Sequence, residues 1–343
     1  MLVFRHAAAF RRGHWKVGFM PRRSINQLGS QEPISQIFLA AHKQLRPNKN
    51  GNLYLQVDLT DRSGSIAARL WNASESEFRN FEDGDFVHVE GTTQIYQGGL
   101  QLIATSISKA REDEVDMADF MPLSPVELDR LASRLAELLR GVRDPQLRNL
   151  VECFLSDDDF MAQFTKAPAG IKNHHAYPGG LLEHVVNLME VVRLIAPRYP
   201  AVDTDLLLVG VLVHDMGKIA ELSFEKSFAY TDEGQLIGHV VQGVGLLDQK
   251  LRQTEALSGE EFPAELALRL KHMIVSHHGQ YEYGSPKLPM TLEAVALHLL
   301  DNLDAKLHSF EQLIRDDSSA ESAWTAYQPS LTRKLFKGAK HSG

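Results

Sequence analysis

One stretch reads Leu206-Leu207-Leu208-Val209-Gly210-Val211-Leu212-Val213-His214-Asp215-Met216-Gly217-Lys218. It is almost wholly apolar until it reaches an adjacent imidazole and carboxylate, which predicts a buried helix that delivers two polar groups. Burying a charged group without a partner costs much free energy. A divalent cation would be such a partner, because neutral imidazole and carboxylate are both good metal ligands. The stretch therefore predicts a helical domain with a metal site inside it.

Other segments of the chain also place His or Asp against an apolar background. A lone histidine on such a face is more often a hydrogen-bonded core residue than a ligand, and one His-Asp pair is weak evidence. The ordered set of His, His-Asp, His, His-His and Asp, each expected on its own helix, is far more specific. The predicted metal ligands are His184, His214, Asp215, His239, His277, His278 and Asp301.

This set resembles the HD-domain superfamily, which is all-α and hydrolyses phosphate esters with divalent metal ions. The resemblance implies that His184, His214, Asp215 and Asp301 hold one ion. A second ion, bridged by Asp215, would take the remaining histidines, His239 and His277, with His278 left open between ligand and neighbour.

The resemblance also assigns catalytic roles to Asp215 and Lys218, in the order His-Asp-x-Gly-Lys. Lys218 would face the substrate phosphate, although the residue alone is equally compatible with a surface lysine. Two metal ions per chain are expected, with manganese implied by the resemblance. Ligand chemistry alone also admits iron, cobalt or nickel, and magnesium suits a His-rich site less well.

The first third of the chain has a different pattern. Leu53, Leu55, Val57 and Leu59 alternate with polar residues, which is the period of a half-buried strand. Similar short runs separated by turns continue to about residue 110. Five or so such strands predict a small closed barrel, because closure removes exposed edges.

These patterns predict a multidomain chain, with a small all-β barrel at 30–110 followed by an all-α domain at 124–315. Residues 111–123 are acidic and suit a solvated linker. The helical part opens on Ser124-Pro125-Val126-Glu127, which predicts a capping box. The remaining ranges are a basic extension at 1–29, expected to be disordered, in which Met20 offers a second start, and a polar, weakly patterned tail at 316–343.

Both halves together are similar to the YhaM family of 3′→5′ exoribonucleases. The motifs that carry this likeness are Asn173-His174-His175-Ala176-Tyr177-Pro178-Gly179-Gly180-Leu181-Leu182-Glu183-His184, His277-His278-Gly279, Gly284-Ser285-Pro286 and Asp301-Asn302-Leu303-Asp304-Ala305-Lys306. The resemblance implies that the barrel is an OB-fold that binds nucleic acid. It also implies that the HD domain removes nucleotides from the 3′ end of single-stranded RNA, with DNA left open.

OB-folds bind single strands by stacking bases on exposed aromatic rings beside cations. Tyr54 lies opposite the apolar face of its strand, whereas Trp71 and Tyr96 suit a core position as well as an exposed one. The candidate phosphate contacts are Lys43, Arg46, Lys49 and Arg69. A net charge of −8 argues against a protein that coats nucleic acid non-specifically.

Two other functions are alternatives to the exonuclease. An HD enzyme for a nucleotide or cyclic dinucleotide would not need the barrel, and Gly279-Gln280-Tyr281 departs from the Gly-Tyr-Pro motif of one such type. A non-catalytic binding module would not need every ligand. The single Cys153 and the absence of a long apolar run lead us to expect a cytoplasmic protein outside the membrane, with assembly of several copies left open.

Overall fold

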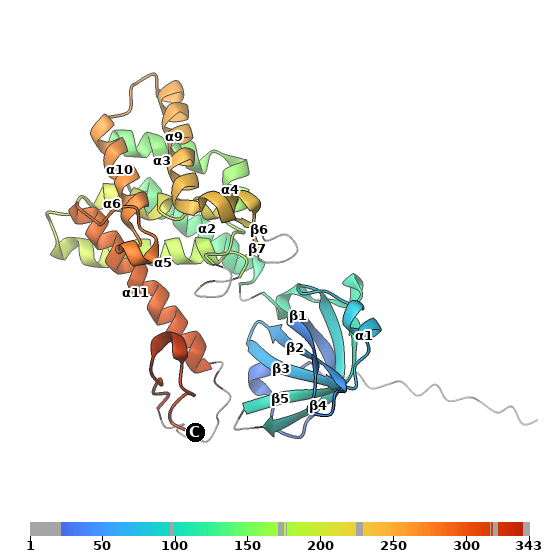
Figure 1. Cartoon of the computed structure of the whole chain (residues 1–343). Helices are drawn as coiled ribbons and strands as arrows, with labels where there is room; N and C mark the ends of the chain where they lie inside the picture. The colour runs from blue at the N-terminus through green and yellow to red at the C-terminus, as the bar shows by residue number, and fades with distance from the viewer. Residues whose placement is uncertain are drawn as a thin grey trace, which may run out of the picture.

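The structure is a computed structural model that describes residues 22–96, 99–121, 123–170, 175, 177–223, 229–315, 317 and 322–338. It has two separate hydrophobic cores, one inside a barrel and one among helices. Figure 1 shows the barrel strands grouped apart from the helices, with the long helix α11 extending from the helical domain. The predicted order of an OB-like barrel and an all-α domain is confirmed.

The barrel is closed by five strands in the order β1-β2-β3-β5-β4. Their bounds are β1 Pro33–Pro47, β2 Leu53–Asp61, β3 Gly64–Trp71, β4 Phe86–Tyr96 and β5 Gly99–Lys109. Leu55, Val57 and Leu59 of β2 are buried, whereas their neighbours along the strand are more exposed. The alternation in the sequence thus separates an inner from an outer face of the sheet.

The barrel domain includes more of the chain than predicted. Ile25, in the 3₁₀ turn Ile25–Gln27, and Leu28 pack into the barrel core, although residues 1–29 were expected to be a disordered extension. Residues 1–21 lie outside the described part of the chain. In the acidic segment, Phe120 packs on Phe86 with ring centroids 4.8 Å apart. This segment is therefore held against the barrel and is not simply a solvated linker.

The helical domain begins at Ser124, where both hydrogen bonds of the predicted capping box are present. The helix α1, Glu75–Arg79, belongs to the barrel. The other helices are α2 Pro125–Arg140, α3 Pro145–Leu155, α4 Asp158–Phe164, α5 Gly180–Ile195, α6 Thr204–Val213, α7 Lys218–Glu221, α8 Asp232–Ile237, α9 His239–Ser258, α10 Ala264–Ser276 and α11 Leu292–Arg315, with a short β6–β7 pair, Leu222–Ser223 and Ala229–Tyr230.

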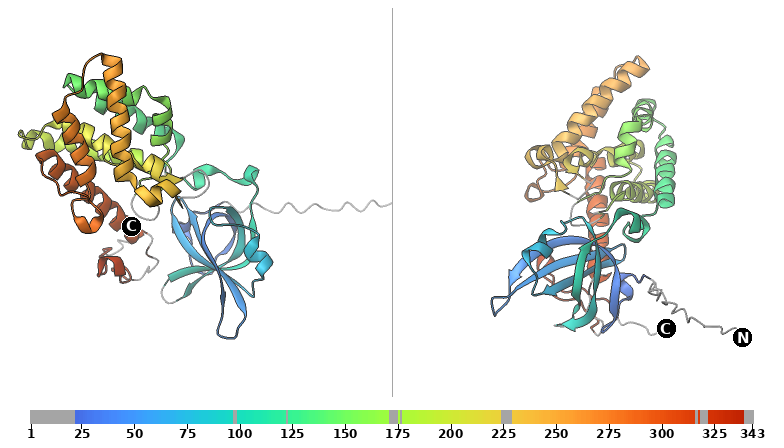
Figure 2. Two further views of the ribbon diagram at one scale, coloured as in Figure 1. Left: turned by 45° about the horizontal axis from the view of Figure 1, so that its top comes forward. Right: turned by 90° about the vertical axis from the view of Figure 1, so that its right-hand side faces the viewer.

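Helix α6 lies at the centre of the domain, where α5, α10 and α11 pack against it (Figure 2). Every residue from Leu206 to Val213 is buried, which explains why this segment is apolar on all sides. The helix ends at Val213, so His214 caps it and Asp215 lies in the turn that follows. We expected one helix to continue to Lys218. Among the described residues, no helix is both long and apolar enough to cross a membrane.

Candidate metal centre and nucleic-acid interface

The ends of several helices bring the predicted ligands together around Asp215. This residue is 2% exposed. On one side its Oδ2 lies 3.4 Å from Nε2 of His214, the cap of α6. His184, from the first turns of α5, and His214 are close enough to Asp215 to share an ion with it. Nε2 of His184 is also 3.3 Å from Oδ1 of Asp301 on α11. The four residues expected to hold one ion therefore lie side by side.

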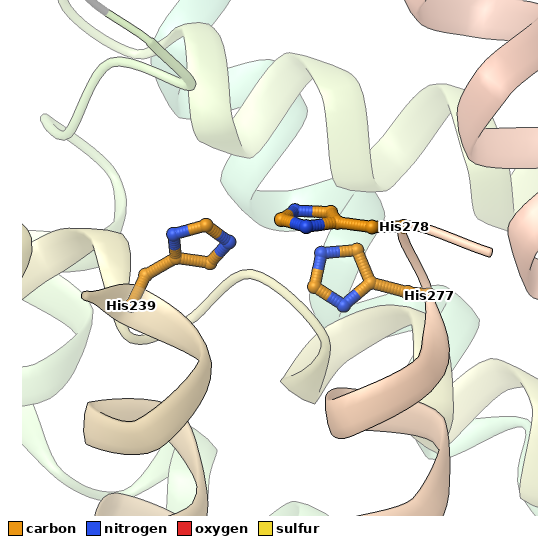
Figure 3. A group of neighbouring side chains, drawn as sticks. All are labelled: His239, His277 and His278. Carbon is orange, nitrogen blue, oxygen red and sulfur yellow. The ribbon is translucent and has the colours of Figure 1, made fainter. Parts of the chain in front are cut away.

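The other carboxylate oxygen of Asp215 faces a second group of histidines. Its Oδ1 is 3.5 Å from Nε2 of both His239 and His277. Figure 3 shows His239, from the start of α9, directed toward His277 and His278 at the end of α10, and the three residues could hold one ion. Asp215 thus has one oxygen toward each group, which is the arrangement a bridging carboxylate needs.

Hydrogen bonds orient four of these imidazole rings. Nδ1 of His214 donates to the carbonyl of Val211 at 2.8 Å, and Nδ1 of His277 donates to the carbonyl of Ile274 at 2.7 Å. Carboxylates serve the other two rings: Nδ1 of His239 is 2.9 Å from Glu221 and Nδ1 of His184 is 2.7 Å from Asp304. With the proton held on Nδ1, the Nε2 lone pair of each ring is directed toward the centre.

The donor atoms that face the centre fit a metal site. Among the described residues, buried donor atoms without a hydrogen-bond partner concentrate here. Nitrogen and oxygen ligands bonded at about 2.1 Å to one ion lie roughly 3.0 to 3.4 Å apart, which is close to the separations observed. The atoms without a hydrogen bond are Nε2 of His214, His239 and His277, Nδ1 of His278 and Oδ1 of Asp215.

Burial and neighbouring charges shift the pKa values of several residues in the centre. Burial opposes ionisation of Asp215, yet the Lys218 ammonium and His214 hold the pKa of its carboxyl well below its usual range. Burial lowers the pKa of His184, but Asp301 and Asp304 outweigh it and raise that pKa to about 9. A metal ion that binds Nε2 of this ring would therefore displace a proton from it. Burial lowers the pKa of His278 to about 4, so this ring is a neutral donor over the physiological range.

Lys218 lies at the start of α7, and its ammonium contacts Oδ2 of Asp215 at 2.6 Å. Its side chain is largely buried beside the centre, so a snorkelling surface lysine does not describe it. Burial lowers the pKa of Lys218, but Asp215 outweighs burial and raises it. Lys218 is therefore a fixed positive charge next to the predicted bridging carboxylate.

Two carboxylates that orient the ligand rings, Glu221 and Asp304, have roles that the sequence alone does not assign. Glu221 accepts hydrogen bonds from both the backbone and the ring of His239. Asp304 lies one turn after Asp301, and its Oδ2 contacts His184 and, at 3.0 Å, Nε2 of His175. His175 and Asp304 each stand in a motif of the family resemblance, but the residues that they contact depend on the tertiary fold. Asn173, His174 and Ala176 of that motif lie outside the described residues.

Glycines allow the backbone to approach closely around the centre. A Cβ on Gly217 would lie 2.0 Å from the carbonyl oxygen of His239 and 2.8 Å from the nitrogen of Gly243. Real Cβ atoms do not approach backbone atoms this closely, so only glycine lets the turn after Asp215 cross the start of α9. This contact sets the distance between Asp215 and His239.

The outer face of the barrel places three predicted residues in one row. The β-sheet register pairs Arg46 with Tyr54 and Tyr54 with Trp71, and the rings of Tyr54 and Trp71 lie 5.0 Å apart. Trp71 is 44% exposed and Tyr96 is 50% exposed, so both rings lie on the surface. The guanidinium of Arg69 lies 5.4 Å from the ring centre of Tyr96. Aromatic rings and cations therefore share this face.

The predicted lysines occupy different environments. Lys49 is exposed in the turn between β1 and β2, next to the row that starts at Arg46. The Lys43 side chain is 7% exposed, and its ammonium binds Glu82 and the carbonyls of Phe78 and Phe81. Lys43 therefore holds α1 and the residues after it against β1, and its charge is not available to a phosphate on the surface.

Comparison with known proteins agrees with both halves of this arrangement. The HD domain family model matches residues 181–306, and the model described as an OB-fold nucleic acid binding domain matches residues 41–110. A protein of Bacillus velezensis named "3'-5' exoribonuclease YhaM" is 36% identical over 284 residues, covering 82% of this chain and 87% of that protein. The chain belongs to the YhaM family. The predicted family is thus confirmed.

Two solved structures align with about a quarter of this YhaM-family chain. The second OB-fold domain of replication protein A from Methanococcus maripaludis is 25% identical, covering 26% of this chain and 95% of that domain, with a TM-score of 0.20. The mitochondrial single-stranded DNA binding protein Rim1 from S. cerevisiae is 16% identical, covering 24% of this chain and 98% of Rim1, with a TM-score of 0.20. At these TM-scores neither likeness carries an argument about this protein.

Gly217→Ala should weaken metal binding, because the added Cβ would push the start of α9 and His239 away from Asp215. We expect manganese affinity to fall by about tenfold or more, measured by calorimetric titration of metal-free protein. Gly245→Ala, on α9, is the matched control because its Cβ would meet nothing within 4 Å. The control should keep its affinity and gain up to about 1 kcal/mol in unfolding free energy. Equal affinities in both variants would contradict this role for Gly217.

Asp304→Ala should also weaken metal binding, because it removes the acceptor that orients His184. Loss of such a partner typically costs about 10–100-fold in metal affinity. Asp304→Asn keeps an oxygen acceptor and should recover part of the loss. Glu311→Ala, exposed on the same helix, should leave affinity unchanged. An Asp304→Ala protein with wild-type affinity would show that the hydrogen bond to His184 is dispensable.

Proposed function

We propose that the centre around Asp215 hydrolyses single-stranded RNA from its 3′ end, one phosphodiester bond at a time. The observation that supports this most strongly is the convergence of unpaired imidazole nitrogens on the two oxygens of one buried carboxylate. Membership of the YhaM family and an OB-like barrel on the same chain favour a nucleic-acid strand over a free nucleotide as substrate.

His184, His214, Asp215 and Asp301 would hold one divalent ion, and His239, His277 and His278 a second, with Asp215 between them. Bound ions of this kind lower the pKa of water and stabilise negative charge on phosphate oxygens. A site with mostly imidazole donors suits manganese, iron, cobalt or nickel better than magnesium. Manganese is the ion we propose, and iron, cobalt and nickel are to be tested beside it.

Lys218 would act on the substrate from beside the bridging carboxylate. Its ammonium is bound to Oδ2 of Asp215, in a position where the charge is largely shielded from bulk water. Once Asp215 binds metal, the same ammonium would face a nearby phosphate oxygen. A fixed cation that needs no reorganisation stabilises the negative charge that develops during phosphoryl transfer.

The barrel would hold the strand upstream of its 3′ end. Arg46, Tyr54 and Trp71 form one row across the outer face, and Arg69 lies beside Tyr96. Bases would stack on the aromatic rings while Arg46, Lys49 and Arg69 contact phosphates, a mode that tolerates any sequence. The chain is acidic overall, so binding would be confined to this local surface.

The direct test follows the degradation of a 5′-labelled single-stranded RNA with added manganese. We expect a ladder that shortens from the 3′ end with wild type, and no products with Asp215→Ala or with EDTA. A parallel DNA strand and parallel reactions with iron, cobalt and nickel define substrate and metal preference, and sedimentation of the same preparations measures self-association. An intact RNA strand with every ion would contradict the proposal and turn attention to nucleotides and cyclic dinucleotides.

Trp71→Ala should weaken RNA binding without disturbing the metal centre. Base stacking on one ring is worth about 1–3 kcal/mol, so we expect a loss of roughly 5- to 150-fold in affinity. Fluorescence anisotropy in EDTA measures binding without cleavage, and hydrolysis of bis(p-nitrophenyl) phosphate with manganese reports on the centre alone. Tyr199→Ala removes an exposed ring of the helical domain and should change neither. Unchanged RNA affinity in Trp71→Ala would show that the row of Arg46, Tyr54 and Trp71 does not bind RNA.

A further inference from the structure

The chain after α11 forms a small hairpin within the range expected to be a weakly patterned tail. The backbone nitrogen of Thr325 donates to the carbonyl of Leu335 at 2.9 Å, and that of Gln328 donates to the carbonyl of Arg333 at 2.9 Å. Thr325 and Leu335 are buried. Residues 322–338 are therefore folded, with an inner and an outer face.

Asp317 fastens this hairpin to the end of α11. Its side chain is 6% exposed, and its two oxygens accept hydrogen bonds from Lys337, at 2.6 Å, and from the backbone nitrogen of Ala326, at 2.8 Å. One carboxylate therefore holds both arms of the hairpin. The ion pair also compensates the charge of Lys337.

The outer face of the hairpin presents three aromatic rings. Trp324 and Phe336 are cross-strand partners whose ring centroids lie 4.9 Å apart, and they are 49% and 59% exposed. Tyr327 is 55% exposed. A cross-strand aromatic pair stabilises a hairpin, which accounts for part of this arrangement. It does not account for Tyr327 or for the exposure of all three rings in so short a segment.

The same segment is basic. Arg333 and Lys334 are exposed, and residues 322–338 contain no acidic residue. The chain as a whole carries a net charge of −8, so this segment differs in sign from the rest of the molecule. Exposed rings near exposed cations are typical of surfaces that bind single-stranded nucleic acid without sequence preference.

The position of the hairpin suits an upstream part of the strand. Asp301 of the metal centre and Arg315 both lie on α11, along which the backbone advances roughly 21 Å between them at about 1.5 Å per residue. A stacked strand advances about 3.4 Å per nucleotide, so this span corresponds to roughly six nucleotides. In Figures 1 and 2 the hairpin lies at the end of α11, on the side of the molecule where the barrel lies.

We propose that the hairpin of residues 322–338 is a second binding site for single-stranded RNA, with Trp324, Tyr327 and Phe336 as stacking rings and Arg333 and Lys334 as phosphate contacts. The inference rests on the proposed exoribonuclease function, because the RNA it binds is the substrate of the metal centre. The hairpin engages only strands long enough to reach it, and shorter strands depend on the metal centre and the barrel.

Two variants of the full chain test this site without touching the buried contacts of the hairpin. One is Tyr327→Ala, which leaves the Trp324–Phe336 pair in place, and the other is Arg333→Gln with Lys334→Gln. Tyr199→Ala and Arg198→Gln remove an exposed ring and an exposed cation of the helical domain as matched controls. Anisotropy in EDTA with single-stranded RNAs of 4 to about 20 nucleotides measures affinity as a function of length.

We expect the aromatic variant to bind the longest RNA about tenfold more weakly than wild type, and to bind RNAs shorter than about six nucleotides as wild type does. The charge variant should lower the slope of log affinity against log salt by about 1.4, since each phosphate contact on a single strand contributes about 0.7. Both variants should hydrolyse bis(p-nitrophenyl) phosphate at the wild-type rate.

Wild-type affinity for long RNA in both variants, in a preparation where Trp71→Ala does weaken binding, would overturn the second site while leaving the exoribonuclease proposal intact. A variant that changes the sedimentation of the protein and not its RNA affinity would also overturn it, because the face would then contact protein. A wild-type chain that neither binds nor degrades RNA would instead refute the proposed function, and with it the basis of this inference.

Discussion

Asp215 lies buried between two groups of imidazoles. A buried carboxylate requires compensating partners, and the helices of this domain pack so that their ends supply those partners. An apolar helix, α6, leads to it and ends one residue before His214. The histidines come from the ends of α6 and α10 and the first turns of α5 and α9, and α11 supplies Asp301. Each element is anchored in the hydrophobic core, so the donor atoms are fixed before any ion binds. A site of this kind needs little reorganisation when it binds its ions, which is the condition for strong and selective metal binding.

The sequence predicted the two-domain architecture and the set of ligands because both depend on local pattern. Alternation in Leu53–Leu59 identifies a half-buried strand, and the apolar run before His214 identifies a central helix. The histidines stand out because polar groups in such surroundings are costly unless they have a partner. The end of α6 could not be located from this pattern, since the turn at Asp215 depends on how closely Gly217 approaches the backbone of His239.

Roles that depend on contacts between distant elements escaped prediction. Glu221 looks like an ordinary surface acid in the sequence, and Asp304 stands in a family motif that gives it no role of its own. Only the fold shows that they hold the rings of His239 and His184. Lysine is a residue type that often contacts phosphates, but the ammonium of Lys43 donates instead to the carbonyls of Phe78 and Phe81. The C-terminal hairpin has neither a regular strand period nor a long apolar run, so its aromatic residues carried no signal until their pairing was visible.

The caps of two helices have a consequence for charge. His214 and His277 follow the last residues of α6 and α10, where the partial negative charge of each helix dipole is concentrated. Backbone carbonyl dipoles would thereby face the proposed ions, and the proposed donors include only two acidic ligands, Asp215 and Asp301. Imidazoles are neutral when they coordinate, so divalent ions held by so few anions would leave the centre with a net positive charge. A chain with a net charge of −8 would in this way carry a positively charged interior site that attracts the phosphates of its substrate.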